Sequence, residues 1–176
     1  MKHKKLILLS LAAIFVGGLR ENLCTANSES LTGRHNTACT KLANGAFASR
    51  HLLVVLVTDA DHVTPCSAST RPYGLCDDQA DAAGDVVNVQ YLGGNRTVRM
   101  VATAAIAEDL DVYTAANGQV QALPNASVTV WRVGVTKRAS SVASDGNNYV
   151  EVLPQTPEQV VVTAGSGSGS AALGAG

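Results

Sequence analysis

Short runs of β-prone residues, each followed by a turn signal, make up most of the chain from residue 50 onward. The run at 51–58 has a continuously apolar centre, whereas 96–102, 128–135 and 148–153 alternate polar and apolar residues. Alternation with a period of two is typical of a strand that buries one face. No amphipathic pattern long enough for a helix separates these runs, which argues against a parallel α/β sheet. The chain is therefore predicted to be mainly β, as a small antiparallel β-barrel or sandwich.

Glycine and asparagine mark the turns between these runs. Gly93-Gly94-Asn95 predicts that 85–92 and 96–102 pair as an antiparallel hairpin. Asn117-Gly118 predicts a second hairpin between the short runs on either side of it. Beyond the last alternating run, the prolines at 154 and 157 predict an interruption before one more short β-prone run.

The composition limits both the core and the partners. Hydrophobic residues make up 46% of the 176 residues but aromatic ones only 4%, so the core is expected to consist of small side chains. This hydrophobic content also argues against disorder along the whole length. The 13 Lys and Arg residues face 14 Asp and Glu, giving a formal net charge of -1, and the basic excess of a nucleic-acid-binding protein is missing.

Three segments are expected: an extended N-terminal arm at 1–49, a β domain at 50–163 and a flexible tail of Gly, Ser and Ala at 164–176. The arm begins with basic residues and the apolar run Leu6–Val16, which is shorter than the ~20 residues that span a bilayer. Because Arg20 and Glu21 precede the nearest small-x-small cleavage triplet, we interpret this run as an assembly arm that packs on a neighbouring subunit. The alternative left open is a cleaved signal peptide on a secreted or surface β domain with one or two disulfides.

The four cysteines, Cys24, Cys39, Cys66 and Cys76, leave the redox state open. No C-x-x-C pair is present, so neither a zinc ribbon nor a thioredoxin-type site is supported. Cys66 and Cys76 flank a turn-like segment across which they could be bridged, although reduced, half-buried thiols are the favoured interpretation.

The densest group of chemistry-bearing residues is Asp59-Ala60-Asp61-His62, followed by Cys66. Two carboxylates and an imidazole could hold a divalent ion, or His62 with Cys66 and Cys76 could hold zinc, as in a small metal-dependent enzyme. The favoured interpretation is turn chemistry, in which the carboxylates cap backbone N–H groups. Neither a phosphate-binding glycine loop nor a nucleophile elbow occurs. No catalytic residue, metal site or cofactor is therefore predicted.

Two histidines directly follow an arginine, at Arg34-His35 and Arg50-His51. Pairing of such a histidine with Cys24 or Cys39 would give a Cys/His catalytic set. We favour contacts in which these dipeptides donate charge-assisted hydrogen bonds to an adjacent subunit or sheet. The acidic residues at 77, 78 and 81 are interpreted as part of a solvated loop.

Several short motifs follow one another between residues 18 and 163. They are Ser-Leu-Thr-Gly-Arg-His-Asn-Thr at 30–37, Arg-His-Leu-Leu-Val at 50–54, Thr-Asp-Ala-Asp-His-Val at 58–63, Arg-Pro-Tyr-Gly at 71–74, Ala-Gly-Asp-Val-Val-Asn-Val at 83–89 and Val-Glu-Val-Leu-Pro at 150–154. In this order they resemble the capsid decoration, or cement, proteins of tailed bacteriophages, and more specifically the lambda-like head decoration group.

This resemblance implies a non-enzymatic, head-stabilising virion protein on the outer surface of an icosahedral capsid. It implies binding, as a homotrimer, to the major capsid protein, whose neighbouring subunits it would clamp, with no contact to nucleic acid or membrane. The arm would extend onto the capsid protein, so removal of residues 1–40 is expected to leave a folded β domain that no longer binds capsids. The residues expected at the capsid or subunit interface are Arg20, Glu21, Asn22, Arg34, His35, Asn36, Thr37, Arg50 and His51.

Overall fold

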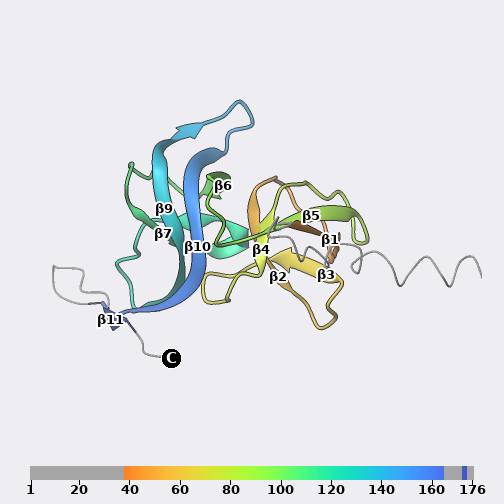
Figure 1. Ribbon diagram of the computed structural model, residues 1–176, viewed down its shortest axis with the longest axis horizontal. Coiled ribbons are helices and arrows are strands. Elements are labelled where there is room, and N and C mark those ends of the chain that lie inside the picture. Colours follow the sequence, from red (N-terminus) through yellow and green to blue (C-terminus); the bar gives the residue numbers. More distant parts are fainter. Residues whose placement is uncertain (1–37, 165–171, 174–176) are drawn as a thin grey trace, which may run out of the picture.

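The computed structural model describes residues 38–164 and 172–173 and shows a mainly β protein with two lobes side by side (Figure 1). One lobe is a closed barrel of five strands in the order β1-β3-β2-β4-β5, which confirms the predicted fold class. Within it β1 pairs in parallel with β3, and the other neighbours are antiparallel. The barrel strands are β1 (Ala38–Ala43), β2 (Leu52–Leu56), β3 (His62–Pro65), β4 (Gly74–Cys76) and β5 (Val86–Tyr91).

The second lobe is a sheet in the order β11-β10-β6-β8-β7-β9, in which β9 also pairs with β10. The strands β10, β6, β8, β7 and β9 therefore hydrogen-bond in a ring. Its elements are β6 (Val98–Ala102), β7 (Asp111–Thr114), the 3-10 turn η2 (Ala116–Gly118), β8 (Val120–Gln121), β9 (Val128–Val142), β10 (Asn148–Val162) and β11 (Ala172–Leu173). The two 15-residue strands β9 and β10 form the long hairpin that dominates this lobe in Figure 1.

The two lobes share strands between their cores. In β2, Val54 is buried in the barrel core while Leu53 is buried in the core of the second lobe. In β6, Val101 packs into the barrel core and Met100 into the other. A strand that is buried on both faces needs apolar residues in succession, which explains why 52–57 lacks the alternation seen elsewhere. The lobes are thus packed on each other through β2 and β6.

The turn at Gly93-Gly94-Asn95 does not form the predicted hairpin. β5 before it pairs with β1 and β4, and β6 after it pairs with β10 and β8, so segment 92–97 crosses from one lobe to the other. Both strands alternate as a hairpin would require. The two strands do not pair because their apolar faces pack into different cores. Val89 of β5 is buried in the barrel core, and Met100 of β6 is buried in the core of the second lobe.

The hairpin predicted at Asn117-Gly118 is confirmed. Thr114 of β7 lies opposite Val120 of β8, and Asn117 has the positive φ, 58°, that suits asparagine in a tight turn. The Gly118 amide donates a hydrogen bond to the Cys66 carbonyl at 2.8 Å. This bond ties the turn to the segment that follows β3.

The β domain begins earlier than the sequence predicted. Residues 38–43, which were assigned to the arm at 1–49, form β1 and lie between β3 and β5 in the barrel wall. Leu42 pairs with both His62 and Val86, and Ala43 is fully buried. The stretch Ala-Cys-Thr-Lys at 38–41 shows no clear alternation of polar and apolar residues, so the sequence pattern did not indicate a strand here. Removal of residues 1–40 would therefore cut into the barrel.

β10 continues through Pro154 and Pro157, where the sequence predicted an interruption. β6 pairs with 148–152 and β11 with 160–161, so among the described residues the prolines have no strand beside them on that edge. Pairing with β9 also shifts its register between Pro154 and Glu158. Proline lacks an N–H donor and is tolerated at such edges and bulges.

The C-terminal segment expected as a tail, 164–176, contains one short strand. Ala172–Leu173 forms β11, antiparallel to Val160–Val161. The rest of that segment beyond Ala164 lies outside the described residues, as does the apolar run Leu6–Val16. Within 38–164 and 172–173 there is no helix long and apolar enough to cross a membrane.

Candidate functional site

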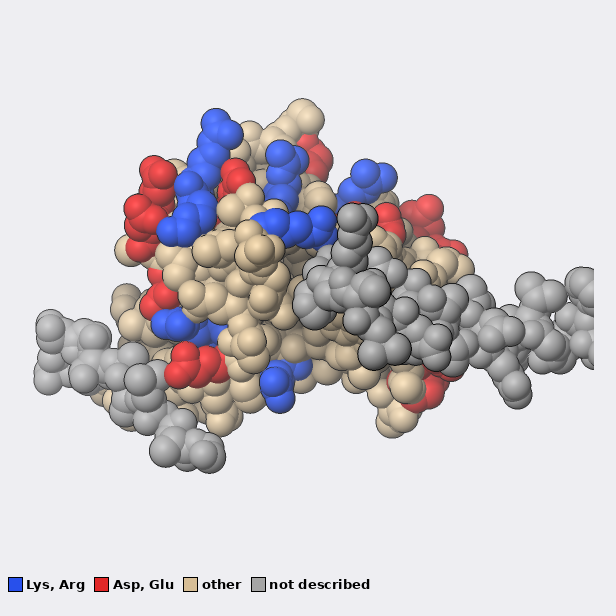
Figure 2. All heavy atoms as spheres, in the orientation of Figure 1, with Lys and Arg blue, Asp and Glu red and all other residues tan. Residues whose placement is uncertain are grey.

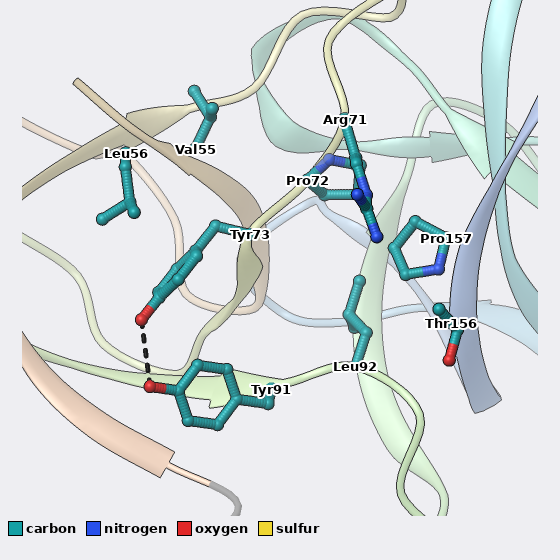
Figure 3. A pocket seen from close by; sticks show the side chains of 9 residues that line it. All are labelled: Val55, Leu56, Arg71, Pro72, Tyr73, Tyr91, Leu92, Thr156 and Pro157. Carbon is teal, nitrogen blue, oxygen red and sulfur yellow. Dashed lines mark hydrogen bonds between the residues drawn. The ribbon is translucent and has the colours of Figure 1, made fainter. Parts of the chain in front are cut away.

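An open pocket of about 400 Å³ lies where the barrel meets the long hairpin (Figure 3). Most of its lining comes from the barrel side, and β10 contributes one wall at its proline bend. The lining residues are Val55, Leu56, Arg71, Pro72, Tyr73, Tyr91, Leu92, Thr156 and Pro157. These described lining residues include no carboxylate, imidazole or thiol, and their apolar and aromatic character suits binding more than proton transfer.

Two tyrosines fix the polar end of this pocket. The Tyr73 and Tyr91 hydroxyl oxygens lie 3.0 Å apart in a hydrogen bond, shown dashed in Figure 3. Their rings meet edge to face, with centroids 5.4 Å apart and planes at 75°. This is a preferred geometry for aromatic pairs, because the positive edge of one ring meets the negative face of the other. The pair therefore presents a preformed surface with two hydroxyl groups.

Burial raises the pKa of the Tyr73 phenol, and its hydrogen bonds to Tyr91 and Cys39 raise it further. Lys41 Nζ lies 5.8 Å from the Tyr73 ring centroid and donates a hydrogen bond to the Ala60 carbonyl at 2.5 Å. Tyr73 is therefore neutral at physiological pH and acts as a hydrogen-bonding group of the pocket.

The opposite rim of the pocket carries a cation held against an aromatic ring. The Arg71 guanidinium lies 5.7 Å from the Trp131 ring, and Trp131 Nε1 donates a hydrogen bond to the Ser69 carbonyl at 3.1 Å. Stacking of this kind orients the guanidinium and leaves its donors available. The rim can therefore receive an anionic or carbonyl group beside the apolar floor.

The first described residues of the chain stand beside this pocket. Ala38 lies opposite Gln90, the residue before Tyr91, and Cys39 Sγ is 3.6 Å from the Tyr73 hydroxyl. The described chain therefore enters β1 at the edge of the pocket.

Two of the expected interface residues, Arg50 and His51, lie just before β2 where the lobes meet. Arg50 is exposed. His51 Nδ1 lies 3.4 Å from Asp77 Oδ1, and its ring meets the Tyr149 ring edge to face at 5.8 Å. Burial raises the pKa of Asp77, against the opposing effect of His51. His51 thus contacts its own chain, while Arg50 faces solvent.

The remaining expected interface residues lie outside the described residues. They are Arg20, Glu21, Asn22, Arg34, His35, Asn36 and Thr37.

The Asp59-His62 segment forms a turn. Asp59 Oδ1 accepts hydrogen bonds from the amides of Asp61 at 3.2 Å and His62 at 2.8 Å, and it also lies 2.8 Å from His62 Nδ1. The hydrogen bond from His62 is the main reason that the pKa of Asp59 is lowered. Within the part of the chain that the structure describes, no three His, Cys, Asp or Glu side chains come together as a metal site would require.

The three described cysteines, Cys39, Cys66 and Cys76, are free thiols. Cys66 is buried in the core of the second lobe and Cys76 in the barrel core, so the turn between them does not bring them together. Burial raises the pKa of Cys66 to about 12 and that of Cys76 to about 11. Both thiols therefore act as core residues.

The sequence did not identify the pocket residues. Tyr73 belongs to the Arg71-Pro72-Tyr73-Gly74 motif, but Tyr91 is 18 residues away on another strand. Only the β4–β5 register, which places Gly74 opposite Tyr91, brings the two rings together. No local pattern in the sequence indicates this pairing, because it depends on the order of the strands in the barrel.

No protein-family model matches the chain, and no curated protein matches it. A solved structure to which it is similar is that of the head fiber gp8.5 N base in bacteriophage phi29, with 17% sequence identity and a TM-score of 0.48. The similarity covers 68% of this chain and 94% of that chain. Any assignment of function to the present chain therefore rests on its own residues.

Proposed function

We propose that this protein is a non-enzymatic structural component of a tailed-phage virion. It binds the outer surface of the icosahedral head and stabilises the capsid by clamping neighbouring major capsid protein subunits, as a homotrimer. The proposal is supported by the motif order that resembles head decoration proteins, and by a mainly β architecture in which the described pocket is suited to binding.

The main support for the proposal is that the strand following the N-terminal segment, β1, is built into the barrel wall. β1 is held on one side by β5 and on the other by β3, and the chain enters it at Ala38 beside the tyrosine pair. A segment anchored in a closed barrel wall can bind a partner without loosening the domain that carries it. Its backbone N–H and C=O groups can be satisfied by a sheet edge on that partner.

Co-sedimentation with expanded heads of the encoding phage, prepared without this protein, tests the proposal. The full chain is expected to pellet with the heads, whereas a variant lacking residues 2–37 is expected to stay in solution. The deletion stops before β1, and circular dichroism checks that the variant is folded. A variant lacking 165–176 is the matched control and is expected to bind.

Different co-sedimentation results would contradict the proposed function and the proposed role of the arm. A full chain that does not bind heads overturns the function, and a 2–37 deletion that binds at full occupancy overturns the role of the arm. The intact mass of head-bound protein tests the secreted alternative, because cleavage of a signal would remove the first ~20 to 26 residues.

A further inference from the structure

A polar hollow of about 380 Å³ lies on the outer face of β6, β10 and β9, apart from the tyrosine pocket. Glu151 of β10 lies directly opposite Arg99 of β6 and also opposite Arg138 of β9. Residues directly opposite on paired strands project from the same face, so the two arginines flank one glutamate. Thr97, Ser141 and Tyr149 complete the polar lining.

β9 is irregular at this hollow. Its register with β10 shifts between Tyr149 and Glu151 and again between Glu151 and Val152, so Arg138 lies between two bulges. A bulge leaves an extra residue unpaired and redirects the neighbouring side chain. The irregular pairing thus places the exposed Arg138 opposite Glu151.

The residues that line the hollow include more positive than negative side chains. The Glu151 carboxylate accepts a hydrogen bond from the Thr97 hydroxyl at 2.5 Å, and the Arg99 guanidinium lies 5.4 Å from the Tyr149 ring. Among the described residues, neither Arg99 nor Arg138 takes part in an ion pair. The lining of the hollow itself holds two guanidinium groups and one carboxylate. A second carboxylate, that of Asp145, lies beside it and accepts a hydrogen bond from the Tyr149 hydroxyl at 2.6 Å. The forked donors of the two arginines, which form no ion pair among the described residues, suit a further carboxylate.

A complementary acidic loop lies on the barrel of the same chain. Residues 77–85 contain four aspartates and no basic residue. Hydrogen bonds to its own carboxylates fix the loop. Asp78 Oδ2 accepts a hydrogen bond from the Asn88 amide of β5 at 2.8 Å, and Asp85 Oδ2 accepts one from the Asp81 amide at 2.8 Å. Asp81 itself is exposed. The loop therefore presents a fixed negative surface.

Figure 2 shows basic side chains along the upper part of the second lobe, with some acidic side chains among them, and further acidic side chains over the barrel. The hollow belongs to the second lobe and the acidic loop to the barrel. A neighbouring copy that offers its acidic loop to the hollow would pair opposite charges, whereas like surfaces brought together would repel.

We propose that the hollow between Arg99 and Arg138 receives the acidic loop 77–85 of a second copy of this chain. This contact names a surface for the self-association in the proposed function and rests on that part of it. It does not depend on head binding. Each contact joins two different surfaces, so the symmetry of the assembly decides whether it closes.

Sedimentation velocity of the full chain at low and high salt tests this contact. Wild type is expected to self-associate at low salt, and the double variant Arg99→Gln, Arg138→Gln is expected to associate about tenfold more weakly. Lys137→Gln is the matched control, because this lysine is adjacent to Arg138 but binds Asp109 at 3.2 Å. The control is expected to associate as wild type does.

A charge exchange identifies the two surfaces. Arg99→Glu, Arg138→Glu in one variant and Gln79→Lys, Asp81→Lys in another are each expected to be monomeric alone and to form a complex when mixed. A monomeric wild type at every concentration, undiminished association of the Arg99→Gln, Arg138→Gln variant, or the absence of a mixed complex from folded variants would overturn the proposed contact. Head binding, measured separately, decides the function.

Discussion

The carbonyl oxygen of His51 accepts a hydrogen bond from the amide of Val101 at 3.1 Å, and this bond joins the residue before β2 to the middle of β6. His51 holds a left-handed backbone conformation with φ of 62°. Nearby, Asn147 Nδ2 donates a hydrogen bond to Ser49 Oγ at 3.3 Å. Residues 49–51 therefore connect the barrel to the second lobe through both backbone and side-chain contacts.

Replacement of His51 separates its backbone role from its side-chain role. His51→Ala and His51→Gly both lose the imidazole contacts, but only alanine keeps a Cβ in the left-handed region. We expect the alanine variant to be about 1 kcal/mol less stable than the glycine variant in urea unfolding. Equal stabilities would show that the backbone strain at this position is not significant.

Gly118 is expected to tolerate no side chain. It has φ of 72°, and an added Cβ would collide with the Leu53 carbonyl oxygen and come within 3.1 Å of Leu52 Cβ. Gly84 has φ of 89° but open space around it. Gly118→Ala should therefore cost about 1–3 kcal/mol more than Gly84→Ala, because only the first adds overpacking to backbone strain. Thermal and urea unfolding of both variants measure the difference.

Thr136 is a fully buried polar residue whose hydroxyl is fully used. Its Oγ1 donates to the Ala107 carbonyl and accepts from the Leu110 amide, both at 2.8 Å. Thr136→Val leaves both groups without their partner and should destabilise the fold by about 1–3 kcal/mol. Thr136→Ser keeps the hydroxyl and should retain protection of the Leu110 amide from hydrogen exchange. Loss of that protection in the serine variant would contradict this explanation.

The buried thiols of Cys66 and Cys76 are expected to resist alkylation in the folded protein. Their pKa values, raised by burial to about 12 and about 11, leave little thiolate, and their positions in the two cores exclude reagent. Iodoacetamide at mildly alkaline pH should modify them only after urea is added, as counted by peptide mass spectrometry. A Cys66–Cys76 disulfide in the native protein would contradict the separation of the two side chains.

Ionisation of Asp77 is expected to destabilise the folded state as pH rises. Its pKa is raised by burial, with His51, Asp78 and Arg96 as the charged groups around it, so the folded state binds its proton more tightly than the unfolded state. The contribution of Asp77 to the free energy of unfolding therefore falls as pH increases from 3.8, the usual value, through the raised pKa. The stability of Asp77→Asn relative to wild type should rise over this range.

The Asp59→Asn variant serves as the comparison for Asp77. The pKa of Asp59 is lowered, so its contribution to stability is lost as pH falls, and its asparagine variant should change in the opposite direction with pH. Urea unfolding over a series of pH values measures both. The same direction of change in the two variants would contradict the pKa assignments.

The sequence predicted the strands better than their partners. Alternation at 128–135 and 148–153 marked parts of β9 and β10, because a solvent-facing side leaves a period of two. The pairing of β5 with β1 was not predictable, since β1 at 38–43 has no clear pattern and its partner is far along the chain. Strand order depends on which apolar faces share a core, and local patterns do not contain that information.

For the candidate site, too, local contacts were predicted from the sequence and contacts between distant strands were not. The turn chemistry of Asp59 was predicted because it involves residues two and three positions apart. The tyrosine pocket and the arginine hollow were missed, since each depends on register between strands distant in sequence. Alternation at 96–102 indicated a half-buried strand, but only its pairing with β10 puts Glu151 beside Arg99.

The position of β1 in the barrel wall has a mechanical consequence. A pull on the N-terminal segment acts along β1 from Ala38, and the hydrogen bonds to β5 and β3 lie across that direction. Such a load shears both ladders together, whereas a strand peeled from a sheet edge loses its bonds one at a time. Tension applied to the segment would therefore reach the whole barrel before β1 could detach.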